Sequence, residues 1–241
     1  GYRFGAVVID AVHFLPQSRP RLFVIAVSEK LPLAGALGES GARTQWHPAN
    51  LTTAYERLSS ESKEAWVWWD LPMPAPRQTT FADILEENPD GVSWHTAAET
   101  KRLLDLMSSL HREKVEKAKM AERRMVGAIY KRTRMDETGA RKQRAEVRFD
   151  DVAGCLRTPV GGSSRQSILI VEGNTVRSRL LSPREAARLM GLPDTYKLPM
   201  NYNEAYHLAG DGVAVPVVRH LAAHVLEPLF ATIAADDQEA A

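Results

Sequence analysis

This 241-residue sequence has a single cysteine, a net charge close to zero and no long run without charged residues. The single cysteine, Cys155, excludes a disulfide within the chain and fits a reducing compartment. The longest stretch without Asp, Glu, Lys or Arg, Thr44–Tyr55, is polar and too short to span a bilayer, so no membrane partner is expected. No basic-then-apolar leader opens the sequence, so the expected location is the cytoplasm.

The small net charge conceals a strongly basic segment. Overall, 31 Lys and Arg oppose 30 Asp and Glu, which gives a net charge of +1. Between Lys101 and Phe149, however, 15 Lys and Arg meet only 7 Asp and Glu, so this segment carries +8 and the remainder −7. One basic block in a near-neutral chain indicates a polyanion that binds to one face of the protein.

The composition is that of a folded chain, with 44% hydrophobic and 25% charged residues, and the length allows one large domain or two small ones. Apolar, β-branched runs predict strands at Ala6–Ile9, Leu22–Val27, Val147–Val152 and Ser167–Val171. Because the first two runs do not alternate with polar residues, we expect them to be buried on both faces, as in a sheet flanked by helices.

Two capping boxes predict where helices begin. Thr96–Glu99 opens a helix that we expect to continue through Glu113–Arg124. Ser182–Glu185, with Pro183 at the first helical position, opens a shorter helix that Gly191 ends.

A third predicted helix, Val213–Leu229, follows a turn at Gly210–Gly212. His220 and His224 stand four residues apart on it, which is a spacing that metal ligands use. Because no HExxH pattern and no convincing third ligand accompany them, an ordinary helix face is the preferred interpretation and no metal site is predicted.

Tryptophan is absent after Trp94, and four of the five tryptophans lie in Trp46–Trp69. The cluster Trp66–Trp69, followed by the proline-rich stretch Pro72–Pro76, predicts a small aromatic core that ends in an extended turn. A platform for a ligand or a stacked base is the alternative.

Two basic clusters, 131–134 and 141–144, lie in a turn-prone region around Gly139. The segment 154–166 that follows contains Gly161 and Gly162, which allow a close approach of the backbone to a surface. The Ser, Thr, Arg and Gln residues around them supply donors suited to phosphates and base edges. A plain turn is an equally good interpretation of the glycine pair.

Three separated segments resemble the C-terminal signature blocks of the DNA (cytosine-5) methyltransferases. Leu15–Ile25 is similar to the family's Gln-x-Arg-x-Arg block between two strands. Arg179–Asp194 resembles the RxLTPRExARLxGxPD block, with Ser182 in place of Thr. Gly210–Val217 resembles the terminal GN-[SA]-VPxP block, with Asp211 where the family usually has Asn.

The resemblance implies an α/β fold, namely the C-terminal portion of a class I, Rossmann-like, S-adenosylmethionine-dependent methyltransferase sheet plus a mixed α+β target-recognition domain. It implies the last strands of the catalytic domain at 1–30, a DNA-binding insert at 31–178, a return to the catalytic domain with a closing helix at 179–233 and an acidic tail at 234–241.

The family's blocks for the cofactor loop, the nucleophilic cysteine and the catalytic acid are missing from this sequence, so we expect the chain to be inactive alone. Cys155 lies inside the insert with no proline before it, and is expected to be structural. Two explanations stay open, a truncated product or a natural subunit that joins a catalytic partner.

The resemblance also implies roles for the Gln-x-Arg-x-Arg block. Arg21 is the first candidate to stabilise negative charge that develops toward O2 of a cytosine under attack. Arg19 would orient the acid, the base or the DNA backbone, and Gln17 would shape the loop. Contacts to S-adenosylmethionine are expected at Asp211, Gly212 and Val213.

The expected partner is double-stranded DNA from which one cytosine is flipped, with phosphates held by the basic insert. The residues expected to bind DNA are Lys131, Arg132, Arg134, Arg141, Arg144, Arg157, Thr158, Gly161, Gly162, Ser163, Arg165 and Gln166. A nucleoid-associated enzyme of restriction-modification type is the leading interpretation. A non-enzymatic DNA-binding module and a tRNA cytosine-5 methyltransferase fragment are the alternatives, and the DNA target sequence is open.

Overall fold

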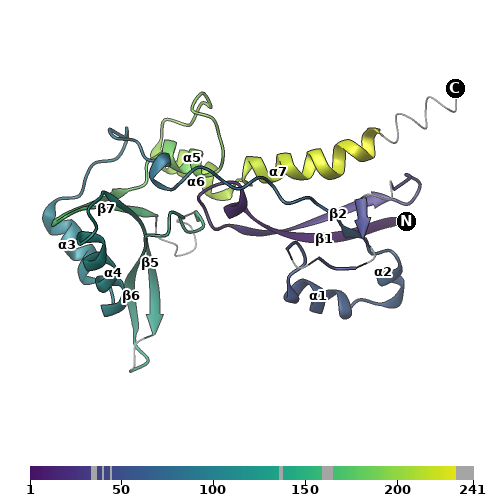
Figure 1. Ribbon diagram of the computed structural model, residues 1–241, viewed down its shortest axis with the longest axis horizontal. Coiled ribbons are helices and arrows are strands. Elements are labelled where there is room, and N and C mark those ends of the chain that lie inside the picture. The colour runs from purple at the N-terminus through teal and green to yellow at the C-terminus, as the bar shows by residue number, and fades with distance from the viewer. Residues whose placement is uncertain (34–36, 40, 44, 136–137, 159–164, 232–241) are drawn as a thin grey trace. The chain divides into compact units, whose positions relative to one another are not determined.

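The computed structural model describes residues 1–33, 37–39, 41–43, 45–135, 138–158 and 165–231. The chain forms two compact units, each assembled from separate stretches. The first comprises Gly1–Phe14, Pro20–Pro76 and Pro216–Ala241, and the second comprises Leu15–Arg19 and Arg77–Val215. The mixture of helices and strands agrees with the expected α/β class (Figure 1).

The first unit contains two small sheets and several short helices. Its elements are β1 (Tyr2–Asp10), a 3-10 turn (Ala11–His13), β2 (Pro20–Ser28), β3 (Gly38–Glu39), α1 (Ala49–Glu56), α2 (Ser60–Glu64), β4 (Trp68–Trp69), α7 (Val215–Leu221) and a π-helical turn (Ala222–Leu226). β1 pairs antiparallel with β2, from Tyr2 opposite Ser28 to Asp10 opposite Pro20, and β3 pairs with β4.

Both predicted N-terminal strands are confirmed, but the expected burial of β2 on both faces is wrong. Ala6, Val7 and Ile9 of β1 are buried, whereas Leu22 and Val24 of β2 are 58% and 66% exposed. Within the described residues β2 pairs only with β1.

The aromatic segment forms a local core in the first unit, as predicted. Trp46 and Trp69 are fully buried, and Trp66 packs edge-on against Trp68 with ring centroids 5.3 Å apart. The main chain of β1 approaches Val67 so closely that a Cβ on Gly5 would lie 1.8 Å from the Val67 carbonyl oxygen. Only glycine fits at this position.

Two histidines of the first unit, the buried His47 and the half-buried His220, predict a pH-dependent stability. Burial lowers the pKa of His47 and of His220. His47 Nδ1 accepts the Arg43 backbone N–H at 2.8 Å, and His220 Nε2 lies 3.0 Å from the Pro72 carbonyl. Both rings therefore take up protons less readily in the folded unit than in the unfolded chain, whose histidines titrate near about pH 6.5.

The free energy of unfolding of the first unit should hence be constant above pH 7 and should fall below about pH 6.5, by at most about 1.4 kcal/mol per pH unit for each histidine. Urea titrations followed by tryptophan fluorescence measure this, because four of the five tryptophans lie in that unit. His47→Gln or His220→Gln should flatten the slope, whereas His207→Gln in the other unit should not. An unchanged slope in both test variants would contradict the prediction.

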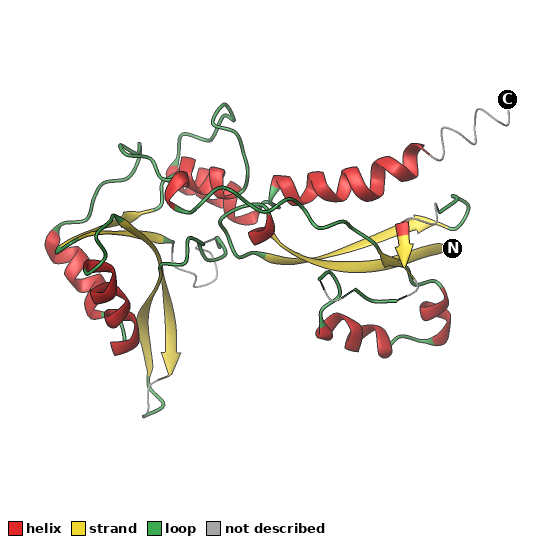
Figure 2. Cartoon of the chain, viewed as in Figure 1, coloured by secondary structure: helices red, strands yellow, loops and turns green. Residues whose placement is uncertain are grey.

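The second unit is built around a four-stranded antiparallel sheet in the order β6-β5-β7-β8. Its elements are a 3-10 turn (Ala82–Ile84), α3 (Ala97–Asp105), α4 (Ser109–Lys119), β5 (Met125–Met135), β6 (Arg141–Arg148), β7 (Ser167–Glu172), β8 (Thr175–Leu180), α5 (Pro183–Leu189) and α6 (Tyr202–Asp211). Leu103, Val115, Ile129 and Leu169 pack in one core, which joins α3 and α4 to the sheet (Figure 2).

The capping box of Thr96 with Glu99 is confirmed, but the single long helix predicted to follow it is wrong. α3 ends at Asp105 and α4 begins at Ser109. Between them the chain pairs with β6, since the Leu106 carbonyl accepts the Ala145 backbone N–H at 3.1 Å.

The sheet corrects two further expectations. The strand predicted at Val147–Val152 ends at Arg148, and the two basic clusters lie on paired strands rather than in a turn. β7 confirms the prediction for Ser167–Val171, while β8 was missed because its charged residues hide the pattern. The Gly173-Asn174 pair, with φ +54° at Gly173, is the hairpin signal that predicts β8.

The last helices also differ from the prediction. α5 begins with the expected capping box of Ser182 and Glu185. α6 extends to Asp211, so Gly210 is helical rather than part of a turn, and Gly212 is the C-cap. α7 begins at Val215 rather than Val213. By length and composition alone, the helical stretch 202–231 is able to cross a membrane, a property that core helices of soluble proteins share.

Candidate functional site

Gln17 ties the Leu15–Arg19 turn to two distant segments. Its side chain is fully buried. Nε2 donates to the Leu189 carbonyl at 2.7 Å, and Oε1 accepts the Leu156 backbone N–H at 3.1 Å. The carboxamide therefore joins the turn to the end of α5 and to the segment after β6.

Arg19 lies in a cradle of backbone carbonyls. It is 2% exposed. Its Nη1 donates to the Leu156 carbonyl and its Nη2 to the carbonyls of Gly210 and Gly212, each at 2.8 Å. Nη1 also lies 3.3 Å from Cys155 Sγ. Because the positive charge faces the carbonyls at the C-terminal end of α6, the helix dipole favours it as well.

The structure thus brings together all three segments that resemble signature blocks. Gln17 reaches the second block at Leu189, and Arg19 reaches the third at Gly210 and Gly212. Residues more than 170 positions apart in the sequence meet here through hydrogen bonds with good geometry.

The remaining expected catalytic and cofactor residues are exposed or half-buried. Arg21, on β2 of the first unit, is exposed, and its Nη1 donates to the Pro20 carbonyl at 2.9 Å. Asp211 and Val213 are exposed in the second unit, and Gly212 is half-buried. A Cβ on Gly212 would lie 3.0 Å from the Leu208 carbonyl, so this position favours glycine.

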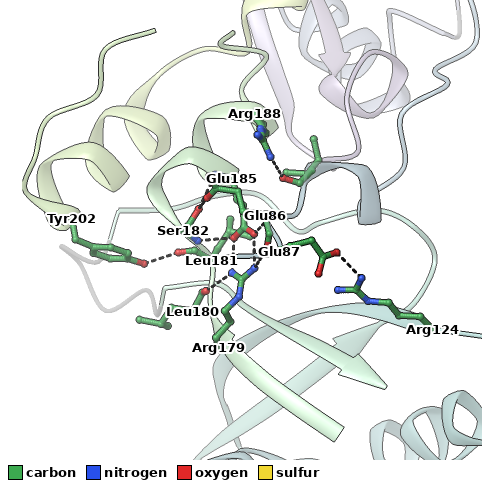
Figure 3. Close-up of polar contacts among 11 residues, drawn as sticks. Glu86, Glu87, Arg124, Arg179, Leu180, Leu181, Ser182, Glu185, Arg188 and Tyr202 are labelled. Carbon is green, nitrogen blue, oxygen red and sulfur yellow. Dashed lines mark hydrogen bonds and ion pairs between the residues drawn. The ribbon is translucent and has the colours of Figure 1, made fainter. Parts of the chain in front are cut away.

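Arg179 and Glu185 form a fully buried ion pair (Figure 3). Arg179 Nη1 and Nη2 donate to the two carboxylate oxygens of Glu185 at 2.7 and 2.6 Å. Nη2 also donates to the Glu86 carbonyl at 3.0 Å, and the guanidinium lies 5.0 Å from the centre of the Trp94 ring. Sequence analysis placed both charged residues in the second block but predicted only the cap.

Glu185 extends this pair into a network (Figure 3). Its carboxylate accepts the backbone N–H of Glu86 at 2.8 Å and that of Ser182 at 2.7 Å. The Ser182 hydroxyl contacts the Glu86 carboxylate at 2.5 Å. β8, α5 and the segment around Glu86 are therefore held together by one buried carboxylate. Glu86 and Trp94 carried no recognisable sequence signal.

The hairpin of β5 and β6, named here the basic hairpin, gathers charge on one face. Register places Arg132 opposite Arg144 and Arg134 opposite Lys142. Alternate residues share a face, so these four cations lie together with Tyr130 and Glu146. Glu146 pairs with Arg134 at 2.6 Å and with Arg132 at 3.8 Å. Like charges directly opposite one another are destabilising, so an external polyanion would stabilise this face.

A cavity of about 350 Å³ lies beside the basic hairpin. Its lining is mostly polar and cationic, and consists of Tyr130, Lys131, Arg132, Thr133, Gln143, Gly154, Cys155, Arg157, Gln166 and Tyr206. Burial raises the pKa of Tyr206, whose hydroxyl oxygen accepts the Gln166 backbone N–H at 3.1 Å. Four of the expected DNA-binding residues thus line one cavity.

The other expected DNA-binding residues are placed as follows. Arg141 lies exposed at the start of β6. Thr158 packs on Gly210: a Cβ added to Gly210 would lie 3.2 Å from Cγ2 of Thr158. Arg165 donates to Asn203 and lies over the Tyr202 ring at 5.1 Å. Gly161, Gly162 and Ser163 are outside the described residues.

The described residues hold no group of three or more His, Cys, Asp or Glu side chains arranged to bind a metal. His220 and His224 lie with ring centres 4.5 Å apart, and His220 contacts the Phe14 ring at 5.2 Å.

Comparison with known families gives one match over most of the chain. Residues 1–227 match the model of the C-5 cytosine-specific DNA methylase family.

Comparison with individual proteins gives shorter matches. The chain is 38% identical over 63 residues to the type II methyltransferase M1.ScrFI of Lactococcus lactis subsp. cremoris, which is 26% of this chain and 16% of that protein. It is 34% identical over 85 residues to the type II methyltransferase M.HpaII of Haemophilus parainfluenzae, which covers 29% of this chain and 24% of that protein. It is 37% identical over 75 residues to the DNA (cytosine-5)-methyltransferase CMT2 of Oryza sativa subsp. japonica, which covers 31% of this chain and 5% of that protein. The chain therefore matches at most about a quarter of the length of these curated relatives.

Proposed function

The chain belongs to the C-5 cytosine-specific DNA methylase family. We propose that it is the DNA-binding, C-terminal part of an enzyme that methylates C5 of cytosine in duplex DNA. The chain alone is inactive under this proposal. A polypeptide that carries the missing blocks, either in the same protein or as a separate subunit, completes the active site. The cytoplasm, in association with the nucleoid, is the proposed location.

The proposed organisation follows the family. Residues 1–30 and 179–233 belong to a class I methyltransferase domain, and residues 31–178 form the target-recognition insert. Exposed Leu22 and Val24 on β2 support this assignment, because apolar side chains at a strand with one paired edge suit a further layer of the same domain.

The observation that carries the proposal is the basic hairpin. Arg132, Arg134, Lys142 and Arg144 share one face with the Glu146 carboxylate. Such a face holds phosphates and releases the counterions condensed on DNA. Arg132 and Arg157 line the cavity beside it, so the cationic surface continues from the strands toward the polar pocket.

Arg21 is the proposed catalytic arginine. When a thiolate attacks C6 of the flipped cytosine, negative charge moves toward O2 and N3 of the ring. An exposed guanidinium on a rigid strand is suited to stabilise that charge by hydrogen bonding to O2. Arg19 and Gln17 are positioning residues in this proposal, because their polar groups bind the backbone of the second and third blocks.

Asp211, Gly212 and Val213 form the proposed contact to S-adenosylmethionine, which supplies the methyl group when bound. The exposed Asp211 carboxylate fits the positively charged amine of this molecule. Under this proposal, the remaining contacts to S-adenosylmethionine belong to the missing blocks.

The basic hairpin predicts salt-dependent binding of duplex DNA by the chain alone. Replacing both Arg132 and Arg144 by Ala should lower affinity for a duplex roughly tenfold and reduce the slope of log K against log salt by about 1.8, since each phosphate contact contributes about 0.9. Fluorescence anisotropy of a labelled duplex over a NaCl series measures both quantities.

The matched control is Lys101→Ala with Arg102→Ala, which removes the same charge from exposed positions on α3. It should leave the slope nearly unchanged. Equal effects of the two double variants would contradict the assignment of the basic hairpin, and absence of any duplex binding would contradict the proposed function. Stronger competition by tRNA than by duplex DNA would favour an RNA substrate instead.

A further inference from the structure

We propose that the cavity beside the basic hairpin takes one nucleotide of the bound DNA strand, and that Gln166 reads a purine base there by donating to N7. This inference rests on the proposed function and names a specificity residue for it.

Gln166 is a buried donor without an acceptor. The residue is 4% exposed and lines the cavity. Its side-chain Nε2 has no hydrogen-bond partner among the described residues. Leaving a buried amide donor unsatisfied is unfavourable, so such groups in a folded protein commonly mark a position that a ligand or water completes.

The main chain of Gln166 is fixed by hydrogen bonds on both sides of the residue. The Gln166 backbone N–H donates to the Tyr206 hydroxyl at 3.1 Å, and its carbonyl accepts the Leu181 N–H at 3.0 Å. A buried donor that an incorrect base would leave unpaired discriminates between bases.

The rest of the lining suits a nucleotide. Arg132 and Arg157 supply positive charge for a phosphate, and the Tyr130 ring, with the Arg132 guanidinium 4.6 Å from its centre, supplies an aromatic surface. The volume of about 350 Å³ falls within the range of pockets that hold small ligands. Glutamine is a common partner of adenine N6 and N7, which is why a purine is proposed.

The first experiment selects bound sequences from duplex DNA with a randomised centre, using the full chain, Gln166→Met and the matched control Gln143→Met on the rim of the same cavity. The unmodified chain and Gln143→Met should enrich one motif that contains a purine. Gln166→Met should lose preference at that single position, by about 5- to 100-fold. A 7-deazapurine at the position should weaken binding of the unmodified chain by the same factor and that of Gln166→Met not at all.

An unchanged motif with Gln166→Met, or no motif with the unmodified chain, would overturn the inference while leaving the proposed function intact. If the unmodified chain bound no duplex DNA at all, that result would instead contradict the proposed function.

A second measurement needs no variant, in case Gln166→Met does not fold. Cys155 is the single cysteine of the chain and lines the cavity. A nucleotide in the cavity should slow alkylation of its thiol by N-ethylmaleimide at least fivefold when duplex DNA is saturating. Equal rates with and without DNA would overturn the inference.

Discussion

Arg179→Met is expected to lower the free energy of unfolding of the second unit by about 3–5 kcal/mol. The substitution leaves Glu185 as an uncompensated charge in a site where both side chains are fully buried. It also removes the donor to the Glu86 carbonyl and the cation that lies over Trp94. Urea denaturation followed by circular dichroism measures the loss, and amide exchange in β7 and β8 assigns it to this unit.

Two variants separate the buried charge from a general effect of losing an arginine. Arg177 lies over the same ring at 4.6 Å but is 47% exposed, so Arg177→Met should cost less than about 1 kcal/mol. Adding Glu185→Gln to Arg179→Met should recover about 1–3 kcal/mol of the loss, since it removes the stranded carboxylate. A cost for Arg179→Met no larger than for Arg177→Met would contradict the role given to the ion pair.

Arg21→Ala is expected to reduce methyl transfer by roughly 10²–10³-fold in the enzyme reconstituted with a polypeptide that carries the missing blocks. The proposed contact of Arg21 to cytosine O2 strengthens as charge develops, so the loss should fall on kcat while affinity for duplex DNA changes little. The rate at which a labelled methyl group is transferred to duplex DNA measures kcat. The chain alone is the negative control, for which no turnover is expected.

Arg19→Met is the comparison that distinguishes chemistry from architecture. Arg19 donates to three backbone carbonyls inside the second unit, so its loss should destabilise that unit by about 3 kcal/mol or more. Arg21 is exposed on β2, so Arg21→Ala should fold as the unmodified chain does. If Arg21→Ala keeps full activity, Arg21 is not the catalytic arginine, and a DNA-binding role without chemistry gains support.

Local physical chemistry made much of the fold predictable. β1, β2 and β7 follow from runs of apolar, β-branched residues, and the starts of α3 and α5 follow from capping boxes whose partners lie three residues apart. The residue patterns that predict these elements are local, although the strands also need partners to pair with.

The errors lie where distant contacts override local preference. A helix predicted to be continuous breaks because Leu106 pairs with Ala145 of β6. Gly210 and Gly212 read as a turn, yet Gly210 is helical and packs against Thr158. The basic clusters looked like a turn because charged residues conceal a strand, and only the pairing of β5 with β6 revealed their common face.

The sequence alone was sufficient for the family, since the residue types and their order in three short blocks carry that information, and it was sufficient for the presence of a basic segment. Only the tertiary structure showed that Arg19 is buried among carbonyls, that Arg179 and Glu185 share a dry site, and that Gln166 lines a cationic cavity. Burial, hydrogen-bond partners and electrostatic surroundings depend on residues far apart in the chain, and these decide whether an arginine supports the fold or faces a substrate.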